Sequence, residues 1–304
     1  MRTVYLGTSG FAATVLRSLA ASEHAPSLVV TPPDSRRGRG RKLAPPPAAE
    51  TARELGLELY QTASVNEPAS HAAIHAIEPE AGAVCAFGQL IGEPLLSEPG
   101  FLNVHPSLLP RWRGSAPIER AVMAGDPETG VTIMHLAREL DAGPVALREA
   151  TPIGPDDYHD VLSGRLAEIG GRLLVRALDL RAAGALELST QDEAAATYAD
   201  KIEASDRRLD PSRAAAELAR RVRALNPHIG THLELADGAR LGVRRARAVE
   251  TPDLEAGRIE ERGGSLVLGV ADAALELQVV QAPGGQPMAA AEFLRGNPLP
   301  PNAI

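Results

Sequence analysis

Short apolar runs alternate with amphipathic stretches along the first two thirds of the chain, and this alternation constrains the fold more than any other feature. Residues 3–7 form a β-rich run, and residues 12–22 follow with apolar side chains at helical spacing. The pattern recurs at the apolar runs 27–31 and 81–88, which are short enough for buried strands. Strands that alternate with helices pair in parallel, so we expect an α/β fold with a doubly wound, mainly parallel, Rossmann-like sheet.

Four further elements extend this pattern. Residues 100–107 resemble a strand that ends in polar groups, residues 116–125 a helix, and residues 129–137 another strand. A long helix is expected over residues 158–184. In a sheet of this kind, ligands bind beyond the carboxyl ends of the strands, so the polar end of the 100–107 strand is the expected site.

The character of the sequence changes after about residue 190. Residues 191–207 are polar and poor in apolar side chains, which is typical of a linker. One amphipathic helix follows at 211–227, and the remainder consists of short strands separated by Gly, Asp and Pro turns. Such strands predict a small barrel or sandwich. We therefore expect a catalytic domain over 1–190, a linker over 191–207, and a C-terminal β-domain over 208–304.

Charge and cysteine content narrow the function. The 304 residues include 31 basic and 39 acidic side chains, and the net charge of -8 argues against a uniformly basic surface for nucleic acid. Cys85 is the only cysteine, so no internal disulfide or multi-cysteine zinc site is expected, and no metal site is predicted. We see neither a signal peptide nor a membrane-spanning segment, and expect a cytoplasmic monomer without a membrane or disulfide partner.

The segment 31–47 concentrates positive charge without an acidic residue after Asp34. Its five basic residues repel one another, so we expect a mobile loop that binds phosphate, with a solvated flexible loop as the alternative. They are Arg36, Arg37, Arg39, Arg41 and Lys42.

Asn103 and His105 are two residues apart, so on a strand their side chains lie on the same face. An amide donates a hydrogen bond to an oxyanion and an imidazole exchanges a proton near neutral pH, as acyl transfer to an amine requires. Asp141, in a turn after the 129–137 strand, can face the same crevice as a carboxylate partner. The alternatives are a capped loop histidine and a plain Asp-Ala-Gly turn.

The segment between these residues carries a further expectation. Arg111 and Arg113 flank a leucine pair and are expected to contact an anionic group.

The sequence as a whole lacks the signatures for dinucleotide binding, phosphate loops, zinc proteases and serine hydrolases, which disfavours those functions.

Residues 103–134, together with 140–145, closely resemble the folate-dependent formyltransferases. Residues 7–19, 32–47 and 223–235 also resemble segments of that family, although His228-Ile229-Gly230 departs from its usual aromatic residue followed by Pro-Gly. The resemblance implies that an OB-like β-barrel forms the C-terminal domain. It also implies transfer of a formyl group from 10-formyltetrahydrofolate to the α-amine of initiator methionyl-tRNA, for translation initiation.

In the roles that the resemblance implies, Asn103 and His105 bind the oxyanion while Asp141 orients His105 and receives the amine proton. The basic segment would enter the acceptor arm of the tRNA, and the C-terminal domain would assist tRNA binding. An amino-sugar nucleotide or another acceptor is the alternative substrate, and a non-catalytic tRNA-binding module is a second alternative. The expected folate pocket is lined by Phe87, Gln89, Leu90, Ile91, Ser107, Leu108, Leu109 and Pro110.

Overall fold

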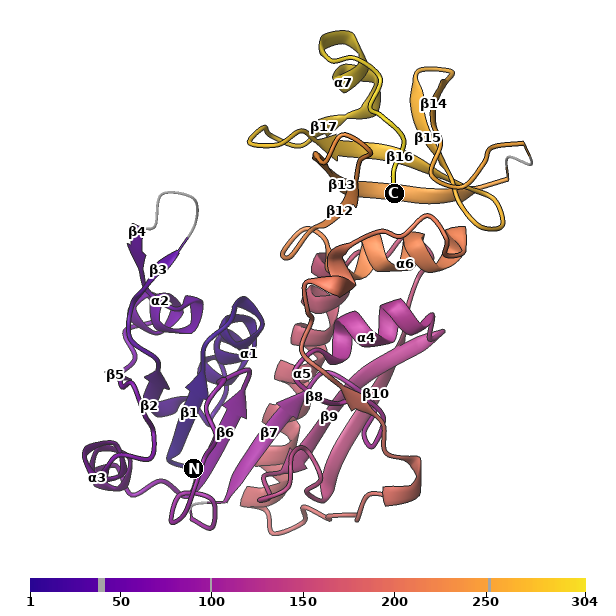
Figure 1. The fold of residues 1–304 in the computed structure, drawn as a ribbon. Coiled ribbons are helices and arrows are strands. Elements are labelled where there is room, and N and C mark those ends of the chain that lie inside the picture. Colours follow the sequence, from indigo (N-terminus) through magenta and orange to yellow (C-terminus); the bar gives the residue numbers. More distant parts are fainter. Residues whose placement is uncertain (38–41, 99, 251–252) are drawn as a thin grey trace. The chain divides into compact units, whose positions relative to one another are not determined.

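The computed structural model describes residues 1–37, 42–98, 100–250 and 253–304 (Figure 1). The chain divides into two compact units. The first comprises residues 1–114, 129–152 and 163–199, and the second comprises residues 115–128, 153–162 and 200–304. Among the described residues, no helix is both long and apolar enough to cross a membrane.

The first unit is built on a seven-stranded sheet whose strand order is β10-β9-β7-β6-β1-β2-β5. The pairs β1–β2, β1–β6, β2–β5 and β6–β7 are parallel, whereas β7 and β9 are antiparallel. The predicted doubly wound, mainly parallel sheet is therefore confirmed. The strands are β1 (Thr3–Gly7), β2 (Pro26–Thr31), β5 (Leu59–Gln61), β6 (Ala81–Cys85), β7 (Phe101–His105), β9 (Glu128–His135) and β10 (Val145–Pro152).

In the part of the chain that the structure describes, the helices of the first unit are α1 (Gly10–Ala20), α2 (Pro47–Glu54), α3 (Pro68–Ala76) and α5 (His159–Ala182) from residue 163 onward. The Ser9 hydroxyl accepts a hydrogen bond from the Ala12 amide and caps α1, whose apolar face is buried. Helix α5 passes close to β7, because a Cβ at Gly170 would lie only 2.7 Å from the Val104 side chain. A larger residue at position 170 would push this helix away from the strand that carries the expected site.

Among the described residues, the first unit also contains two small ladders. Strands β3 (Ser35–Arg37) and β4 (Lys42–Ala44) are antiparallel, so these described parts of the basic segment are paired strands, where we expected a loop. Strands β8 (Arg113–Gly114) and β11 (Tyr198–Ala199) are parallel. The expected linker therefore contributes residues up to 199 to the first unit, including the 3-10 turn η1 (Glu193–Ala195).

The second unit is built on an antiparallel sheet of order β12-β13-β16-β15-β14, with β17 paired to β16. This confirms the predicted C-terminal β-domain. Helix α6 packs against β13 and also against α4, a helix that precedes the C-terminal segment by many residues. The elements are α4 (Pro117–Ala124), η2 (Ser205–Arg207), α6 (Ala215–Leu225), β12 (Thr231–Glu234), β13 (Arg240–Val249), β14 (Ile259–Arg262), β15 (Ser265–Gly269), β16 (Ala274–Gln281), β17 (Met288–Ala289) and α7 (Ala290–Gly296).

Candidate active site

Strand β7 ends in the two polar residues that the sequence singles out. Asn103 is half-buried and His105 is buried, with a relative exposure of 4%. Both side chains lie on the same face because they are two residues apart on a regular strand, which pairs with β6 on one side and β9 on the other. The carboxyl end of a strand inside a doubly wound sheet is where such folds bind ligands.

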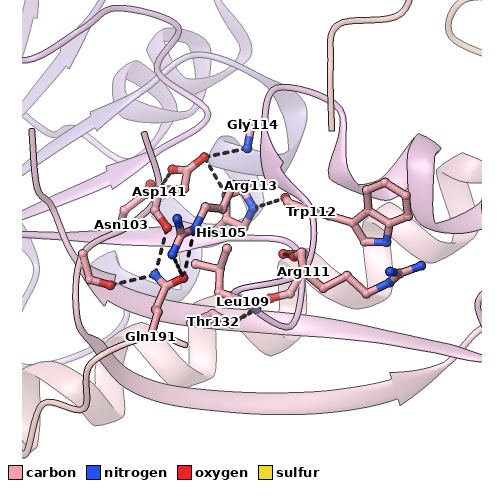
Figure 2. Close-up of polar contacts among 12 residues, drawn as sticks. Asn103, His105, Leu109, Arg111, Trp112, Arg113, Gly114, Thr132, Asp141 and Gln191 are labelled. Atoms are coloured by element: carbon pink, nitrogen blue, oxygen red, sulfur yellow. Dashed lines mark hydrogen bonds and ion pairs between the residues drawn. The ribbon is translucent and has the colours of Figure 1, made fainter. Parts of the chain in front are cut away.

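Asp141 lies opposite these two residues, in a turn that follows β9 (Figure 2). Its Oδ1 atom accepts a 3.4 Å hydrogen bond from Nδ2 of Asn103, and its Oδ2 atom lies 3.7 Å from Nδ1 of His105. The Gly114 amide donates to Oδ2 at 2.8 Å. The structure therefore brings together all three residues that we expected to converge.

The His105 ring is held by a group that the sequence analysis did not identify. Its Nε2 atom lies 2.8 Å from the carbonyl oxygen of Trp112. A carbonyl oxygen only accepts hydrogen bonds, so Nε2 must carry the proton, and in a neutral ring Nδ1 is then an acceptor that faces Asp141. Because 3.7 Å exceeds a hydrogen-bond distance, the Trp112 carbonyl rather than Asp141 orients the ring.

The Asp141 turn is itself held by a buried polar cluster. The Gln191 amide donates to the backbone carbonyls of Asp141 at 2.8 Å and of Gly143 at 2.7 Å. Arg113 donates to Oε1 of Gln191 at 2.9 and 3.1 Å, and to both carboxylate oxygens of Glu193 at 2.7 and 2.9 Å. These bonds matter because Asp141 has a φ of 50°, a backbone conformation that non-glycine residues rarely adopt.

The structure changes the interpretation of the two arginines in this loop. Arg113 is 2% exposed, and its hydrogen bonds to Glu193 raise the pKa of the guanidinium. The prediction that Arg113 contacts an anionic substrate group is therefore wrong, since its donors already bind Gln191 and Glu193. Arg111 is exposed and lies 4.4 Å from the centre of the Trp112 ring, in cation–π geometry.

The residues expected to line a folate pocket follow two adjacent strands. Phe87, Gln89, Leu90 and Ile91 come after β6, and Ser107 to Pro110 come after β7, so both loops start at the same edge of the sheet. Phe87 is buried, whereas Leu90 is 83% exposed. Gln89 uses its side-chain oxygen to accept a 2.8 Å hydrogen bond from the Val65 amide.

Within the second loop, hydrogen bonds and burial fix the backbone. The Ser107 hydroxyl donates to the Arg111 carbonyl at 2.6 Å, and the Thr132 hydroxyl donates to the Ser107 carbonyl at 2.7 Å. Leu109 is 1% exposed, and its amide donates to the Thr132 oxygen at 3.1 Å (Figure 2). Leu108 and Pro110 are half-buried, so they are the members of this set that retain surface for a ligand.

The basic segment is only partly described. Arg36 lies in β3 and Lys42 in β4, and both side chains are exposed. Arg37 pairs with Lys42 in the ladder, whereas Arg39 and Arg41 lie outside the described residues. The expected tRNA contact therefore stays a prediction.

An amide donor, an imidazole and a carboxylate that converge at the open edge of a doubly wound sheet define a site suited to acyl transfer. Comparison with known proteins agrees with this class. The formyl transferase model matches residues 1–178, and the model of the formyl transferase C-terminal domain matches residues 201–298. The chain belongs to the formyl transferase family, as its sequence motifs indicated.

Relatives and solved structures give further detail. The methionyl-tRNA formyltransferase of Methylococcus capsulatus is 43% identical over 98% of this chain and 98% of its own length. The enzyme of the same name from Moorella thermoacetica is 39% identical over 100% of this chain and 99% of its own.

Among solved structures, HypX from Aquifex aeolicus in complex with tetrahydrofolic acid has a TM-score of 0.66 at 18% identity, covering 97% of this chain and 48% of that one. WlaRD, a sugar 3N-formyl transferase, has a TM-score of 0.63 at 13% identity, covering 91% of this chain and 97% of that one. At these identities the likeness extends to the fold alone.

Proposed function

We propose that the protein transfers the formyl group of 10-formyltetrahydrofolate to the α-amino group of initiator methionyl-tRNA, which gives N-formylmethionyl-tRNA for translation initiation. The observation that carries this proposal is the convergence of Asn103, His105 and Asp141 at the end of β7. Further support comes from relatives named methionyl-tRNA formyltransferase, which are 38–43% identical over nearly the whole chain. We also propose that it acts as a cytoplasmic monomer.

The reaction makes two demands on the site. The neutral amine attacks the formyl carbon, so that the carbonyl oxygen becomes negative and the attacking nitrogen becomes positive. The bond between the carbon and the folate nitrogen then breaks, the attacking nitrogen loses a proton, and the folate nitrogen gains one. Donors aimed at the oxygen are worth about 10²–10³ each in turnover, and a positioned acid or base about 10²–10⁴.

The geometry suggests a division of these roles. Asn103 has an amide N–H for the oxyanion, and its present bond to Asp141 is long at 3.4 Å. Asp141 is the proton acceptor, with Oδ2 held in place by the Gly114 amide at 2.8 Å. His105 presents Nδ1 to the same space, where a proton on this atom would be donated to the oxyanion.

We assign folate binding to the two loops that follow β6 and β7. Their half-buried or exposed apolar members, Leu90, Ile91, Leu108 and Pro110, offer faces for a planar ring system, and backbone groups near strand ends suit its polar edge. Phe87 and Leu109 are buried, so we assign them a supporting role beneath the pocket. The tetrahydrofolic acid complex of a neighbour with the same fold is consistent with this assignment.

We assign tRNA binding to two basic regions. The first is the segment from Arg36 to Lys42 on β3, β4 and their connection. The second is a groove of about 530 Å³ in the second unit, whose lining includes four arginines that suit phosphate groups and Glu234, which forms ion pairs with two of them. The arginines are Arg207, Arg208, Arg240 and Arg244. The partition into a catalytic domain 1–190, a linker 191–207 and a tRNA-assisting domain 208–304 remains part of this proposal.

The test is formylation by the purified protein. Wild-type protein, Asn103→Ala and Asp141→Asn are mixed with 10-formyltetrahydrofolate and charged initiator tRNA, and N-formylmethionine is measured by mass spectrometry. We expect each variant to lose about 10² or more in kcat with an unchanged melting temperature. Asn297→Ala is the matched control, because its amide donates to Phe293 in the second unit, at the end of α7. Near-normal turnover in either site variant would refute the assigned roles.

The acceptor is tested separately with the wild-type protein. The same assay offers initiator methionyl-tRNA, elongator methionyl-tRNA and an amino-sugar nucleotide in parallel. Preference for the sugar nucleotide would establish the alternative acceptor, and no transfer to any of the three would favour a non-catalytic tRNA-binding module.

A further inference from the structure

Two imidazoles and a carboxylate meet in the second unit, and none of them belongs to the candidate active site. Glu119 lies on α4, His159 is the first residue of α5, and His228 follows α6. All three belong to residues that cluster in the same unit. One ligand atom of each lies within 4.8 Å of the others.

The distances suit a small metal ion. Oε1 of Glu119 lies 2.9 Å from Nε2 of His228 and 3.5 Å from Nε2 of His159. For a tetrahedral ion with bonds of about 2.0–2.1 Å, neighbouring ligand atoms are about 3.3 Å apart, between these two distances. The imidazole rings are stacked with centroids 3.6 Å apart, so coordination requires one ring to tilt outward. His228 is the ring able to do so, because a third of its side chain is exposed.

Among the described residues, the Glu119 carboxylate forms ion pairs with histidines and with no arginine or lysine. The Glu119 side chain is 13% exposed, and both of its ion-pair partners are histidines. Arg120, the next residue, is directed to Asp206, where its guanidinium donates at 2.9 and 3.1 Å. A carboxylate this far from water is costly unless a positive charge accompanies it. A divalent cation between the three ligand atoms would supply that charge.

We propose that Glu119, His159 and His228 form a divalent transition-metal site. Two imidazoles and one carboxylate favour Zn²⁺ over Mg²⁺ or Ca²⁺, which prefer sites made entirely of oxygen. The ion would connect α4, the start of α5 and the segment between α6 and β12, and solvent would occupy the remaining coordination position. The proposal does not depend on the proposed formyl transfer, because none of its ligands belongs to the candidate active site.

The site escapes sequence inspection because its ligands lie on three segments far apart in the chain. The usual zinc signatures place two ligands within one helix or one short loop. Here each segment contributes one ligand, and packing of α6 against α4 places the segments together.

The experiment measures metal binding by the full-length protein after chelator treatment. Zn²⁺ binding is followed by calorimetry, and Co²⁺ is used as a probe because a four-coordinate cobalt site absorbs visible light strongly. We expect one ion per chain and a higher melting temperature with Zn²⁺. The variants Glu119→Gln and His228→Gln should bind Zn²⁺ roughly 10²-fold more weakly, since each removes one protein ligand.

His75→Gln is the matched control, because this exposed histidine lies in the last turn of α3 in the first unit. It should bind the ion as the wild-type protein does. The proposal is overturned if the wild-type protein binds no ion, or if either site variant binds it as tightly as the wild-type protein.

A second measurement needs no variant. Zn²⁺ should slow modification of His159 and His228 by diethyl pyrocarbonate in the wild-type protein, with His75 unaffected, as mapped by mass spectrometry. Equal modification rates with and without Zn²⁺ would contradict the site even if a variant fails to fold.

Discussion

The substitution Gly143→Ala tests whether the reaction depends on the position of the Asp141 turn. A Cβ built on Gly143 would lie 1.8 Å from the carbonyl oxygen of His135, whereas such contacts are essentially never below 3.0 Å. In Gly143→Ala the two groups must therefore separate by at least 3.0 − 1.8 = 1.2 Å. The obstacle is backbone at the end of β9, so no flexible side chain can move aside to relieve the contact.

The required shift exceeds what the site tolerates. Asp141 is two residues from Gly143, and Gln191 holds the backbone carbonyls of both residues with one amide group. A displacement of 1.2 Å would break at least one of these bonds or the 2.8 Å bond from Gly114 to Asp141. Misplacement of a reacting group by about 1 Å costs about 10²-fold in rate. Overpacking typically destabilises a fold by about 1–3 kcal/mol.

The assay compares Gly143→Ala with Gly164→Ala in formylation kinetics and urea denaturation. Gly164 lies in α5, where an added methyl group would meet no atom within 4 Å, so alanine there should leave kcat unchanged and stabilise the helix by about 0.5–1 kcal/mol. For Gly143→Ala we expect kcat to fall about 10²-fold while the protein remains folded. Wild-type kcat in Gly143→Ala would show that the position of this turn does not matter to the reaction.

Three further predictions concern other parts of the chain. Burial raises the pKa of Cys85 to about 12, so iodoacetamide at pH 8 should label it only after unfolding; rapid labelling of native protein would contradict this. Burial lowers the pKa of His159 from 6.5 to about 4. As the pH falls through this range, the unfolded chain therefore binds a proton at His159 that the folded chain does not bind. With chelator present, urea denaturation should show up to about 3 kcal/mol of stability lost between pH 7 and pH 4 from this group, and His159→Gln should lose less. Arg36→Ala and Lys42→Ala should weaken tRNA binding and each lower the slope of log affinity against log salt by about one, without changing folate affinity; unchanged slopes would contradict phosphate contact.

Local patterns were sufficient for the architecture of the first unit. The apolar run at 81–88 becomes β6, and the polar-ended strand at 100–107 becomes β7, because hydrophobic periodicity reports which faces are buried. The spacing of Asn103 and His105 was enough to place both side chains on one face. Their approach to Asp141 required the additional rule that ligand sites lie at the carboxyl edge of such sheets.

The division of the chain into two compact units was harder to predict from the sequence. The helix expected at 116–125 is present as α4, yet it packs on α6 and clusters with the C-terminal segment. Amphipathic periodicity shows that a helix has a buried face, but it does not identify the element that covers this face. The same limit applies to Glu119 and His228, which are inconspicuous in the sequence and meet only because α4 and α6 pack together.

Arg113 and Gln191 show why a site cannot be completed from its motifs alone. An arginine in a polar loop is consistent with substrate binding, and a glutamine at the start of a polar segment is consistent with a linker. The structure gives both residues a different role, because Arg113 donates to Gln191 and Gln191 donates to the Asp141 turn. Each of these bonds joins residues that are distant in sequence and leaves no periodic signal. A buried guanidinium and a buried amide are tolerated only when their hydrogen bonds are satisfied, so these two side chains hold the turn in one position. The loop around Arg113 therefore positions two residues of the site. The Trp112 carbonyl fixes His105, and the Arg113 side chain, through Gln191, fixes the turn that carries Asp141.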